Sequence, residues 1–339
     1  MDLSSDSTTV SVIIPVYNGG SNFRACLSSV ADCVPPPHEI IVVADGDTDG
    51  SYVVAREFTE KVVRLPEPGG PARARNRGAG LATKEILFFV DADVTVQQGA
   101  IGKIIDAFQH DPDLAAVIGS YDDEPFEPNF LSQYKNLLHH YVHQTANHEA
   151  STFWGACGAI RRNVFASVDG FDEGYRRPCI EDIELGYRLK GAGYKICLIR
   201  EIQVKHLKRW TVRSLLRADF FDRALPWAEL IMRDRRLIND LNLKTADRIS
   251  AISVFLLVFT LTGSLYAPLF LVPAAFLIII LLWLNRGLYR FFIAKRGFGF
   301  TLKTIPWHWF YFLYSGIALS IGLTRQWVRQ HITPFFLDV

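Results

Sequence analysis

Short apolar runs and longer amphipathic stretches alternate along the first 100 residues. Between the runs, apolar residues recur every three or four positions, the spacing of a helix with one buried face. Strands that alternate with helices predict a parallel sheet with helices on both faces. The predicted strands are 10–16, 39–43, 61–65 and 85–90, and the predicted helices are 22–30, about 51–60, and 72–82.

Polar side chains stand where three of these strands end. Asn18 follows the first strand, Asp45 begins an acidic turn after the second, and Asp91 and Asp93 follow the fourth. In open α/β sheets, ligands bind outside the carboxyl ends of the strands. We therefore expect these motifs to converge on one crevice.

Residues 100–200 complete the predicted soluble domain. A polar helix over 132–148 contains His139, His140, His143 and His148, and the first and third of these are four residues apart. Surface histidines on an amphipathic helix are the favoured interpretation, and a metal-binding pair is the alternative. Two further elements are a strand or turn over 153–160 and a helix over 181–189.

A long uncharged segment follows this domain. Residues 249–285 contain no Asp, Glu, Lys or Arg, and one helix of that length would be about 55 Å long. A hydrocarbon core is about 30 Å thick, so two spans fit better than one. We predict a membrane domain over 248–339. Its three transmembrane segments are 249–267, 269–285 and 305–324.

The segment 209–247 joins the predicted soluble domain, 1–208, to the membrane domain. Apolar groups recur in it every three or four residues, with arginines between them. Basic amphipathic helices of this kind lie in the membrane interface. A helical subdomain packed on the sheet is the alternative.

The distribution of basic residues predicts the orientation in the membrane. Five of them lie between the second and third segments, and such loops face the cytoplasm. The N-terminus lacks a basic region followed by an apolar stretch, so we expect no signal peptide and a multi-pass cell-membrane protein with a cytoplasmic catalytic domain. A third full span would place Arg325 and Arg329 outside, so a tilted or partly inserted segment is the alternative. The five residues are Arg286, Arg290, Lys295, Arg296 and Lys303.

Composition narrows the class of protein. The formal net charge is +1, from 36 basic and 35 acidic residues, which gives no reason to expect nucleic acid as a partner. The mean hydropathy of +0.14 is high for a soluble enzyme. The five cysteines are odd in number and form no CxxC pair, so a disulfide framework or zinc site is not expected.

The Asp91-Ala92-Asp93 triplet is the strongest candidate for metal chemistry. Two carboxylates this close repel each other unless a cation lies between them. Mg²⁺ and Mn²⁺ prefer oxygen ligands and bridge to phosphates. The alternative is that the pair caps a helix or decorates a turn.

Two further acidic positions have both a chemical and a structural interpretation. Asp45 can accept hydrogen bonds from a nucleobase or ribose, or it can cap its own turn. The Glu181-Asp182 pair opens a helix, where acids are common caps. A carboxylate there can also act as the general base for a sugar hydroxyl.

The chain resembles glycosyltransferase family 2, whose members invert the configuration at the anomeric carbon and have a GT-A fold. The resemblance covers most of the first 210 residues, and the motifs are specific jointly rather than singly. The matching stretches are SVIIPVYN (11–18), VVADGDTDGS (42–51), ARNRG (74–78), FFVDAD (88–93), GFDE (170–173) and EDIELGYRLKGAG (181–193).

This resemblance implies a role for each matching residue. It implies an α/β GT-A domain with a Rossmann-like mixed sheet and a nucleotide-sugar donor. Asp91 and Asp93 would serve the nucleotide and its Mg²⁺ or Mn²⁺, and Asp182 would be the catalytic base, with Glu181 beside it. The residues implied to line the nucleotide site are Pro15, Tyr17, Asn18, Asp45, Arg75, Asn76, Asp91 and Ala92.

The HLKRW segment at 206–210 departs from one pattern of the family. Processive synthases often have QxxRW, and His206 stands here at the glutamine position. The resemblance implies that His206 reaches the metal, with a structural histidine as the alternative, and that Arg209 and Trp210 lie near the donor. The missing glutamine argues against a processive synthase.

These features predict a non-processive glycosyltransferase that transfers a sugar, most commonly from a uridine diphosphate donor, to a hydroxyl of a lipid or lipid-linked acceptor. The expected partners are the donor, that acceptor and membrane lipids. Three alternatives stay open: a polyprenyl-phosphate glycosyltransferase, a processive polysaccharide synthase and an inactive, membrane-tethered binding module.

Overall fold

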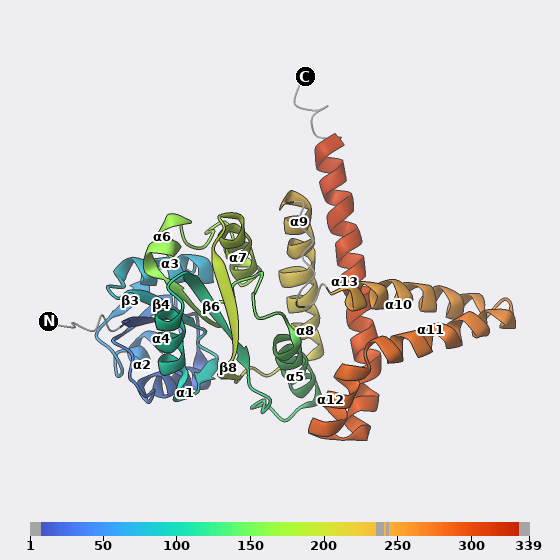
Figure 1. Ribbon diagram of the computed structural model, residues 1–339, viewed down its shortest axis with the longest axis horizontal. Coiled ribbons are helices and arrows are strands. Elements are labelled where there is room, and N and C mark those ends of the chain that lie inside the picture. The colour runs from blue at the N-terminus through green and yellow to red at the C-terminus, as the bar shows by residue number, and fades with distance from the viewer. Residues whose placement is uncertain (1–7, 235–240, 242–243, 332–339) are drawn as a thin grey trace. The chain divides into compact units, whose positions relative to one another are not determined.

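The computed structural model describes residues 8–234, 241 and 244–331. The chain divides into two compact units, Met1–Arg209 and Trp210–Val339, and Figure 1 labels many of their helices and some of their strands. Each unit is described by itself.

The first unit is built on one eight-stranded sheet with the strand order β3-β2-β1-β4-β7-β6-β8-β5. β1 is buried along its whole length, as expected for a strand covered on both faces. The strands are β1 (Val10–Val16), β2 (Glu39–Asp45), β3 (Val62–Leu65), β4 (Ile86–Val90), β5 (Val94–Val96), β6 (Leu114–Tyr121), β7 (Cys157–Arg161) and β8 (Lys195–His206).

The sheet is mixed rather than wholly parallel. β3, β2, β1 and β4 are parallel neighbours, as the alternation of strands and helices predicts. β7 runs antiparallel to both β4 and β6, and β5 runs antiparallel to β8. The start of β7 and the ends of β4 and β8 therefore lie at one edge of the sheet.

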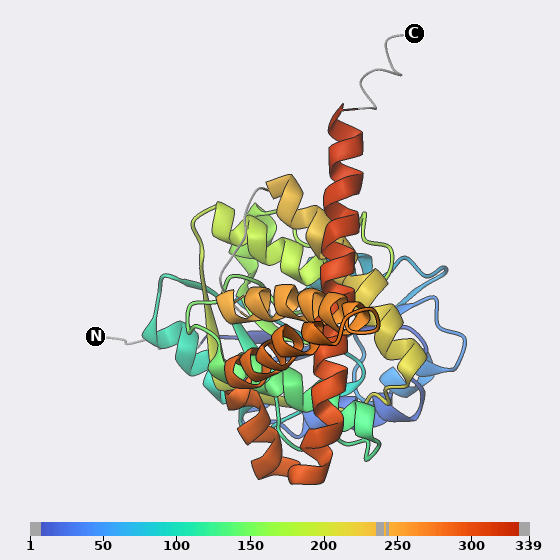
Figure 2. The ribbon, with the colours of Figure 1, turned by 90° about the vertical axis from the view of Figure 1, so that its right-hand side faces the viewer.

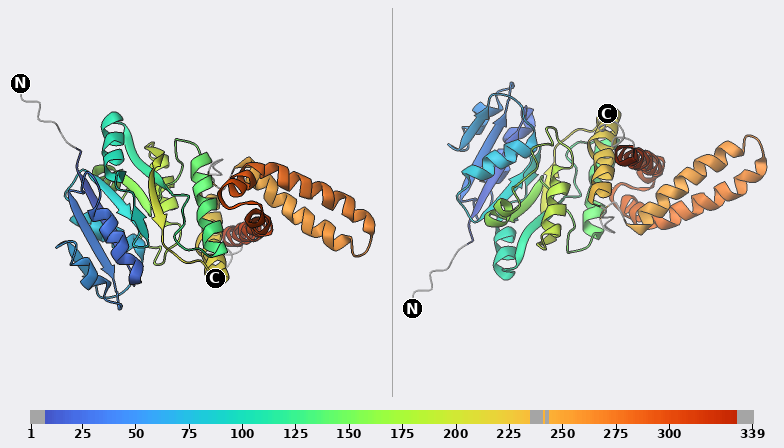
Figure 3. Two further views of the ribbon diagram at one scale, coloured as in Figure 1. Left: turned by 90° about the horizontal axis from the view of Figure 1, so that it is seen from below. Right: turned by 90° about the horizontal axis from the view of Figure 1, so that it is seen from above.

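Helices cover the sheet on both faces, with α1 on one side and α3 on the other (Figure 3). Gly78 has no side chain, which lets α3 lie close to the strands. A Cβ at this position would stand 2.5 Å from a methyl carbon of Ile13. The helices are α1 (Gly20–Ala31), α2 (Ser51–Ala55), α3 (Pro71–Leu81), α4 (Ala100–His110), α5 (Phe130–Thr145), α6 (Arg162–Ser167) and α7 (Glu181–Gly191).

The histidines of α5 correct one expectation. His140 and His143 are buried, and their Nδ1 atoms lie 2.7 Å and 3.0 Å from the carbonyl oxygens of Tyr121 and Gly119 in β6. The interpretation as surface histidines is therefore wrong for these two residues, which tie α5 to the sheet.

The second unit is helical. α10 and α11 lie side by side as a hairpin (Figure 3), and α13 is a 34-residue helix (Figure 2). Residues 235–240 of the predicted amphipathic segment lie outside the described residues. The elements are α8 (Val212–Asp219), η1 (Phe220–Ala224), α9 (Leu225–Asp234), α10 (Thr245–Gly263), η3 (Pro268–Phe270), α11 (Leu271–Leu284), α12 (Arg286–Arg296) and α13 (Phe298–His331).

One helix of the described residues, Thr245–Gly263, is long and apolar enough to cross a membrane. Pro268–Leu284 and Arg286–Arg296 pass the same test together, but they are bent by 65°. The predicted third segment, 305–324, lies within α13, which is not among these candidates. Fold and composition thus supply one candidate span, or two with the bent pair, rather than the three expected.

Candidate active site at the carboxyl edge of the sheet

Asp91 and Asp93 follow β4 at the edge where β7 begins and β8 ends. The Asp91 amide lies 3.4 Å from the carbonyl oxygen of Ala156, just before β7. The Leu207 amide donates to the Asp93 carbonyl at 2.9 Å, just after β8. Segments that are far apart in the sequence therefore meet around this acidic pair.

Arg75 connects the acidic pair to the start of α7. Its guanidinium is 4% exposed and donates to Asp91 Oδ1 at 2.7 Å and to Glu181 Oε1 at 2.8 Å. It also lies 5.2 Å from the centre of the Phe171 ring. A Cβ at Gly155 would stand 2.8 Å from the guanidinium carbon, so only glycine leaves room there. Arg75 is thus held on several sides.

The carboxylates keep this buried arginine charged. Burial alone would lower the pKa of Arg75, but Asp91, Glu181 and Asp182 raise it above its usual value. Burial raises the pKa of Asp91, and Arg75 opposes that shift. A buried ion pair is costly to break, because the remaining partner is left uncompensated. Asp91, Glu181 and Asp182 therefore share the field of one cation.

His206 stands beside the second acid of the pair. Its Nε2 lies 3.4 Å from Asp93 Oδ2, and its Nδ1 lies 2.8 Å from Asn136 Oδ1 in α5. The imidazole also stacks on Tyr121, with 4.7 Å between the ring centres. Burial alone would raise the pKa of Asp93, but His206 and Lys208 lower it to about 2. Asp93 is therefore ionised at neutral pH.

The residues at this point suit a hard divalent cation in type and charge. An ionised carboxylate oxygen and an imidazole nitrogen approach each other, and Mg²⁺ commonly takes only one or two protein carboxylates together with substrate phosphates. Among the described residues, no group of three or more His, Cys, Asp or Glu side chains is arranged to hold a metal. Asp91, the third predicted ligand, is turned to Arg75 instead.

Asp182 lies in the first turn of α7 and is half-buried. Its Oδ1 accepts a hydrogen bond from the Ile183 amide at 2.8 Å, and its Oδ2 accepts one from the Gly155 amide at 3.0 Å. Two backbone donors therefore orient the predicted base. The neighbouring Glu181 carboxylate is buried and accepts from the Cys179 amide at 2.9 Å, a contact of the capping kind, and a catalytic role for Glu181 stays a prediction.

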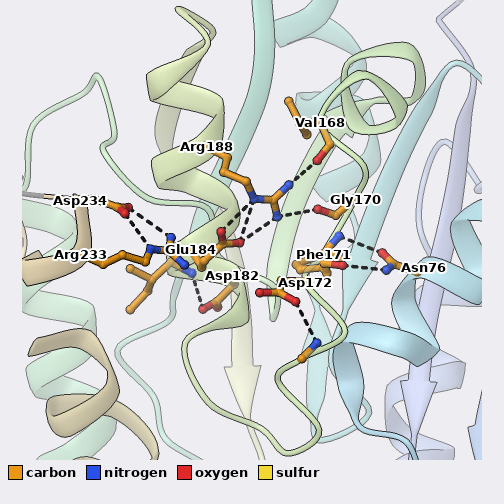
Figure 4. Close-up of polar contacts among 12 residues, drawn as sticks. Asn76, Val168, Gly170, Phe171, Asp172, Asp182, Glu184, Arg188, Arg233 and Asp234 are labelled. Carbon is orange, nitrogen blue, oxygen red and sulfur yellow. Dashed lines mark hydrogen bonds and ion pairs between the residues drawn. The ribbon is translucent and has the colours of Figure 1, made fainter. Parts of the chain in front are cut away.

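Asn76 is bound to the loop that precedes α7 (Figure 4). Its side-chain amide donates to the Phe171 carbonyl at 2.8 Å and accepts from the Phe171 amide at 2.9 Å. Arg188 donates to the carbonyl oxygens of Val168 and Gly170 and is paired with Glu184. Asn76 was predicted to line the nucleotide pocket. In this structure its side chain binds the backbone of the GFDE loop, 170–173.

The acidic turn after β2 is engaged with the neighbouring loops. Asp45 is 4% exposed and accepts hydrogen bonds from the amides of Gly69 and Gly70, at 2.9 Å and 2.8 Å. Asn18 Oδ1 accepts from the Thr48 amide at 2.8 Å. Asp45 therefore binds the loop before α3 rather than capping its own turn, and the nucleotide role of Asp45 and Asn18 stays a prediction.

The remaining predicted residues lie at different places. Tyr17 is 58% exposed beyond the end of β1, whereas Pro15 is buried within β1. Ala92 is half-buried between the two acids. Arg209 is exposed, 3.5 Å from Glu127. Trp210 is the first residue of the second unit, so its place at this edge stays a prediction.

Several residues of the site are not evident from the sequence. The contacts of Gly155 and Phe171 with Arg75, and of Asn136 with His206, join segments 70 or more residues apart, so no local motif predicts them. The Glu184 and Arg188 pair has a visible signal, since opposite charges four residues apart on a helix attract.

Comparisons with known proteins identify the class. Residues 11–168 match the family model described as glycosyl transferase family 2. The chain is 40% identical over 95 residues to the uncharacterized glycosyltransferase YibD of Escherichia coli, covering 27% of this chain and 28% of that protein. It is 27% identical over 203 residues to the probable glycosyltransferase YdaM of Bacillus subtilis, covering 55% and 48%.

A solved structure extends the likeness of fold. The mannosyltransferase PcManGT from Pyrobaculum calidifontis, in complex with GDP-Man and Mn²⁺, aligns with a TM-score of 0.58 at 17% identity and covers 93% of this chain and 88% of its own. The mixed sheet of the first unit is thus GT-A-like in fold. The similarity to glycosyl transferase family 2 lies in residues 11–168, within the first unit. The chain spans less than half the length of the curated relatives YibD and YdaM.

Proposed function

We propose that the protein is an inverting glycosyltransferase that moves a sugar from a nucleotide-diphosphate donor to a hydroxyl of a lipid or lipid-linked acceptor at the cytoplasmic face of a membrane. Uridine diphosphate is the favoured donor nucleotide. One observation carries the proposal: Arg75 joins Asp91, after β4, to Glu181, beside Asp182. The candidate donor-binding acids and the candidate base therefore belong to one connected site.

The donor end of the site is Asp93 with His206. A divalent cation bound there would offset the negative charge of the departing diphosphate. Asp93 stays ionised because its pKa is held at about 2. Asn136 orients the His206 ring through Nδ1 and leaves Nε2 directed at Asp93. The chain thus supplies up to two ligands, as expected for a cation that is also bound by substrate phosphates.

The acceptor end of the site is Asp182. In the proposed reaction, the acceptor oxygen forms a bond to the anomeric carbon on the face opposite the diphosphate, and the bond to the diphosphate oxygen breaks. The proton of the acceptor hydroxyl passes to the Asp182 carboxylate. Backbone amides of Gly155 and Ile183 fix that carboxylate in place, so little reorganisation is needed when the hydroxyl arrives.

The nature of the acceptor is inferred from the second unit. Its α10 and α11 helices are apolar and expose large side chains, among them Phe259 and Phe276. Such surfaces are expected to face lipid rather than water. A protein anchored in this way would meet acceptors that are themselves embedded in the bilayer.

A polyprenyl-phosphate acceptor is the second candidate. Arg176 and Arg177 are exposed in the loop that leads to Glu181, where they can bind an anionic phosphate. A phosphate oxygen attacks without losing a proton, so no base is needed. Asp182 would then be dispensable for catalysis.

A transfer assay tests the proposal. Purified full-length protein in mixed micelles is offered a panel of nucleotide-sugars together with lipid extracts, and the products are identified by mass spectrometry. We expect one donor to be consumed and one sugar to be added to a lipid hydroxyl. A sugar attached through a phosphodiester supports the second candidate, long products support a processive synthase, and no consumption of any donor contradicts all three.

A further inference from the structure

Helix α12 departs sharply from the direction of α11. The two helices are bent by 65° at Asn285, which is buried. The Asn285 side-chain amide donates to Ser250 Oγ at 3.0 Å, near the start of α10, and to the Leu281 carbonyl at 2.9 Å. The end of α11 is therefore tied to the start of α10, so the bend marks one end of the hairpin.

An aromatic and basic pair stands at this level. Trp283 is 60% exposed at the end of α11, and the Arg286 guanidinium lies 4.5 Å from the centre of its ring. Tryptophan is enriched where a membrane-spanning helix meets the headgroup layer, and arginine is favoured on the cytoplasmic side. The bend thus has the side chains expected at a membrane surface.

The apolar face of α12 is already used within the second unit. Tyr289 and Phe292 are buried where α12 packs on α13. The Trp309 indole donates to the Tyr289 hydroxyl at 3.1 Å, and the Phe292 ring lies 5.8 Å from the Phe300 ring. These contacts fix the rotation of α12 about its axis, and therefore determine which side chains it presents outward.

The outward side chains are basic and have no acidic neighbours in the sequence. Arg286 and Arg290 are exposed and stand four residues apart, on one face of the helix. Lys295, Arg296 and Lys303 are exposed nearby. The segment 248–337 contains eight Lys and Arg residues and no Asp or Glu, so its charge is not balanced within the segment.

We propose that α12 and the first turns of α13 form a docking surface for the phosphate headgroups of anionic phospholipids, with Arg286 and Arg290 as the main contacts. The charge of the surface and the interfacial pair at the bend favour this occupant over a protein. The proposal rests on the membrane anchoring proposed above, but not on sugar transfer. A basic residue near an anionic leaflet contributes about 1 kcal/mol, which is about a fivefold change in affinity per residue.

Direct lipid binding by the full-length protein in a neutral detergent tests this surface. The probes are fluorescent phosphatidylglycerol and phosphatidylcholine with the same acyl chains, and inorganic phosphate serves as competitor. The test variant is Arg286→Gln/Arg290→Gln. The matched control is Arg56→Gln/Arg162→Gln, which removes two exposed arginines from the first unit. Because no sugar is transferred in this assay, its result is independent of the proposed activity.

We expect phosphatidylglycerol to bind more tightly than phosphatidylcholine, and we expect the test variant to lose about tenfold or more of that preference. The control variant should keep it. Equal binding of both lipids, or an unchanged preference in the test variant, would overturn the proposal. Full competition by millimolar inorganic phosphate would also overturn it, because the site would then recognise free phosphate rather than a lipid headgroup.

Discussion

The two units of the chain place apolar side chains in opposite ways. In the first unit, large apolar groups such as Phe88 and Phe89 are buried, and charged groups meet at the edge of the sheet. In the second, Phe259 and Phe276 are exposed along α10 and α11, while the polar Asn285 is buried. This difference is what we expect if, as proposed, water surrounds the first unit and lipid surrounds the second.

The same contrast appears in how charge is balanced. In the first unit, the buried Arg75 lies between two carboxylates, so each of these acids has a cation beside it. In the segment 248–337, the basic residues have no acidic residue in sequence to balance them. The first unit thus pairs opposite charges at one edge of its sheet, whereas the proposed headgroup surface of the second unit is basic.

The largest expected effect is the loss of sugar transfer when divalent cations are removed, which acts on the first unit. Chelation with EDTA should reduce sugar transfer to background, and Mg²⁺ or Mn²⁺ should restore it, because Asp93 and His206 would hold a cation that offsets diphosphate charge. The measurement is the initial rate of transfer, with membrane association of the same samples as a control that should not change. Undiminished rates of transfer in the presence of EDTA would show that the reaction needs no divalent cation.

Removing Arg75 should have the next largest effect. Arg75→Met leaves the Asp91 and Glu181 carboxylates without their shared cation, which costs about 3–5 kcal/mol for a buried pair. Arg75→Lys keeps the charge but cannot reproduce the fork of two contacts, so we expect a partial loss of about tenfold in kcat. Circular dichroism separates misfolding from loss of catalysis.

Full activity in Arg75→Met would show that the connection between Asp91 and Glu181 is incidental. A higher KM for the donor with an unchanged kcat would assign Arg75 to donor binding. That is the role predicted for Arg75 from the sequence. The Met and Lys variants together therefore distinguish a positioning role from a binding role.

A matched pair of surface substitutions tests the difference in solvent. Phe259 in α10 is 66% exposed and Val53 in α2 is 65% exposed. Phe259→Arg should impair membrane integration, because an arginine near the centre of a span costs about 2.5–3.5 kcal/mol. Val53→Arg should change stability by no more than about 0.5 kcal/mol. The measurement is the fraction of chain that resists carbonate extraction. Equal behaviour of the two variants would contradict a lipid-facing α10.

The smallest expected effect concerns stability of the first unit away from the site. Burial alone would raise the pKa of Glu39, but hydrogen bonds from Lys61, Ser11 and Thr83 lower it from 4.5 to about 2. The stabilisation is therefore present above about pH 4.5 and is lost as the pH falls towards 2. Glu39→Gln should destabilise the chain by about 1 kcal/mol at pH 7, and the difference should shrink by pH 3.

Thermal unfolding of wild type and Glu39→Gln in detergent at both pH values measures this effect, and transfer activity at pH 7 should stay unchanged. A difference that grows as the pH falls would contradict the assigned direction of the pKa shift.

Local pattern was enough to predict the parallel strands β1 to β4, but not β6 or β8. β1 occupies 10–16 as expected, because a short apolar β-rich run bounded by turn residues has few alternatives. The direction of β7 could not be predicted, because antiparallel pairing with β4 and β6 depends on contacts between distant segments. The buried histidines of α5 were missed for the same reason: their partners are carbonyl groups of β6.

The site was predicted in outline but not in its connections. The motifs located the acids at one edge, yet Arg75 and Glu181 are 106 residues apart and nothing local relates them. Asn76 and Asp45 were expected to line a nucleotide pocket, and here they bind neighbouring loops. Residue type and spacing predict which groups gather, whereas hydrogen-bond partners depend on the packing of the whole unit.

The central claim is that a hydroxyl acceptor loses its proton to Asp182 at the edge that also holds the donor. The most direct measurement compares Asp182→Asn with wild type for both donor binding and sugar transfer. We predict unchanged donor affinity and a fall in transfer of about 10²–10⁴-fold, the usual range for loss of a general base. Normal turnover by Asp182→Asn would contradict the claim and favour an acceptor that needs no base.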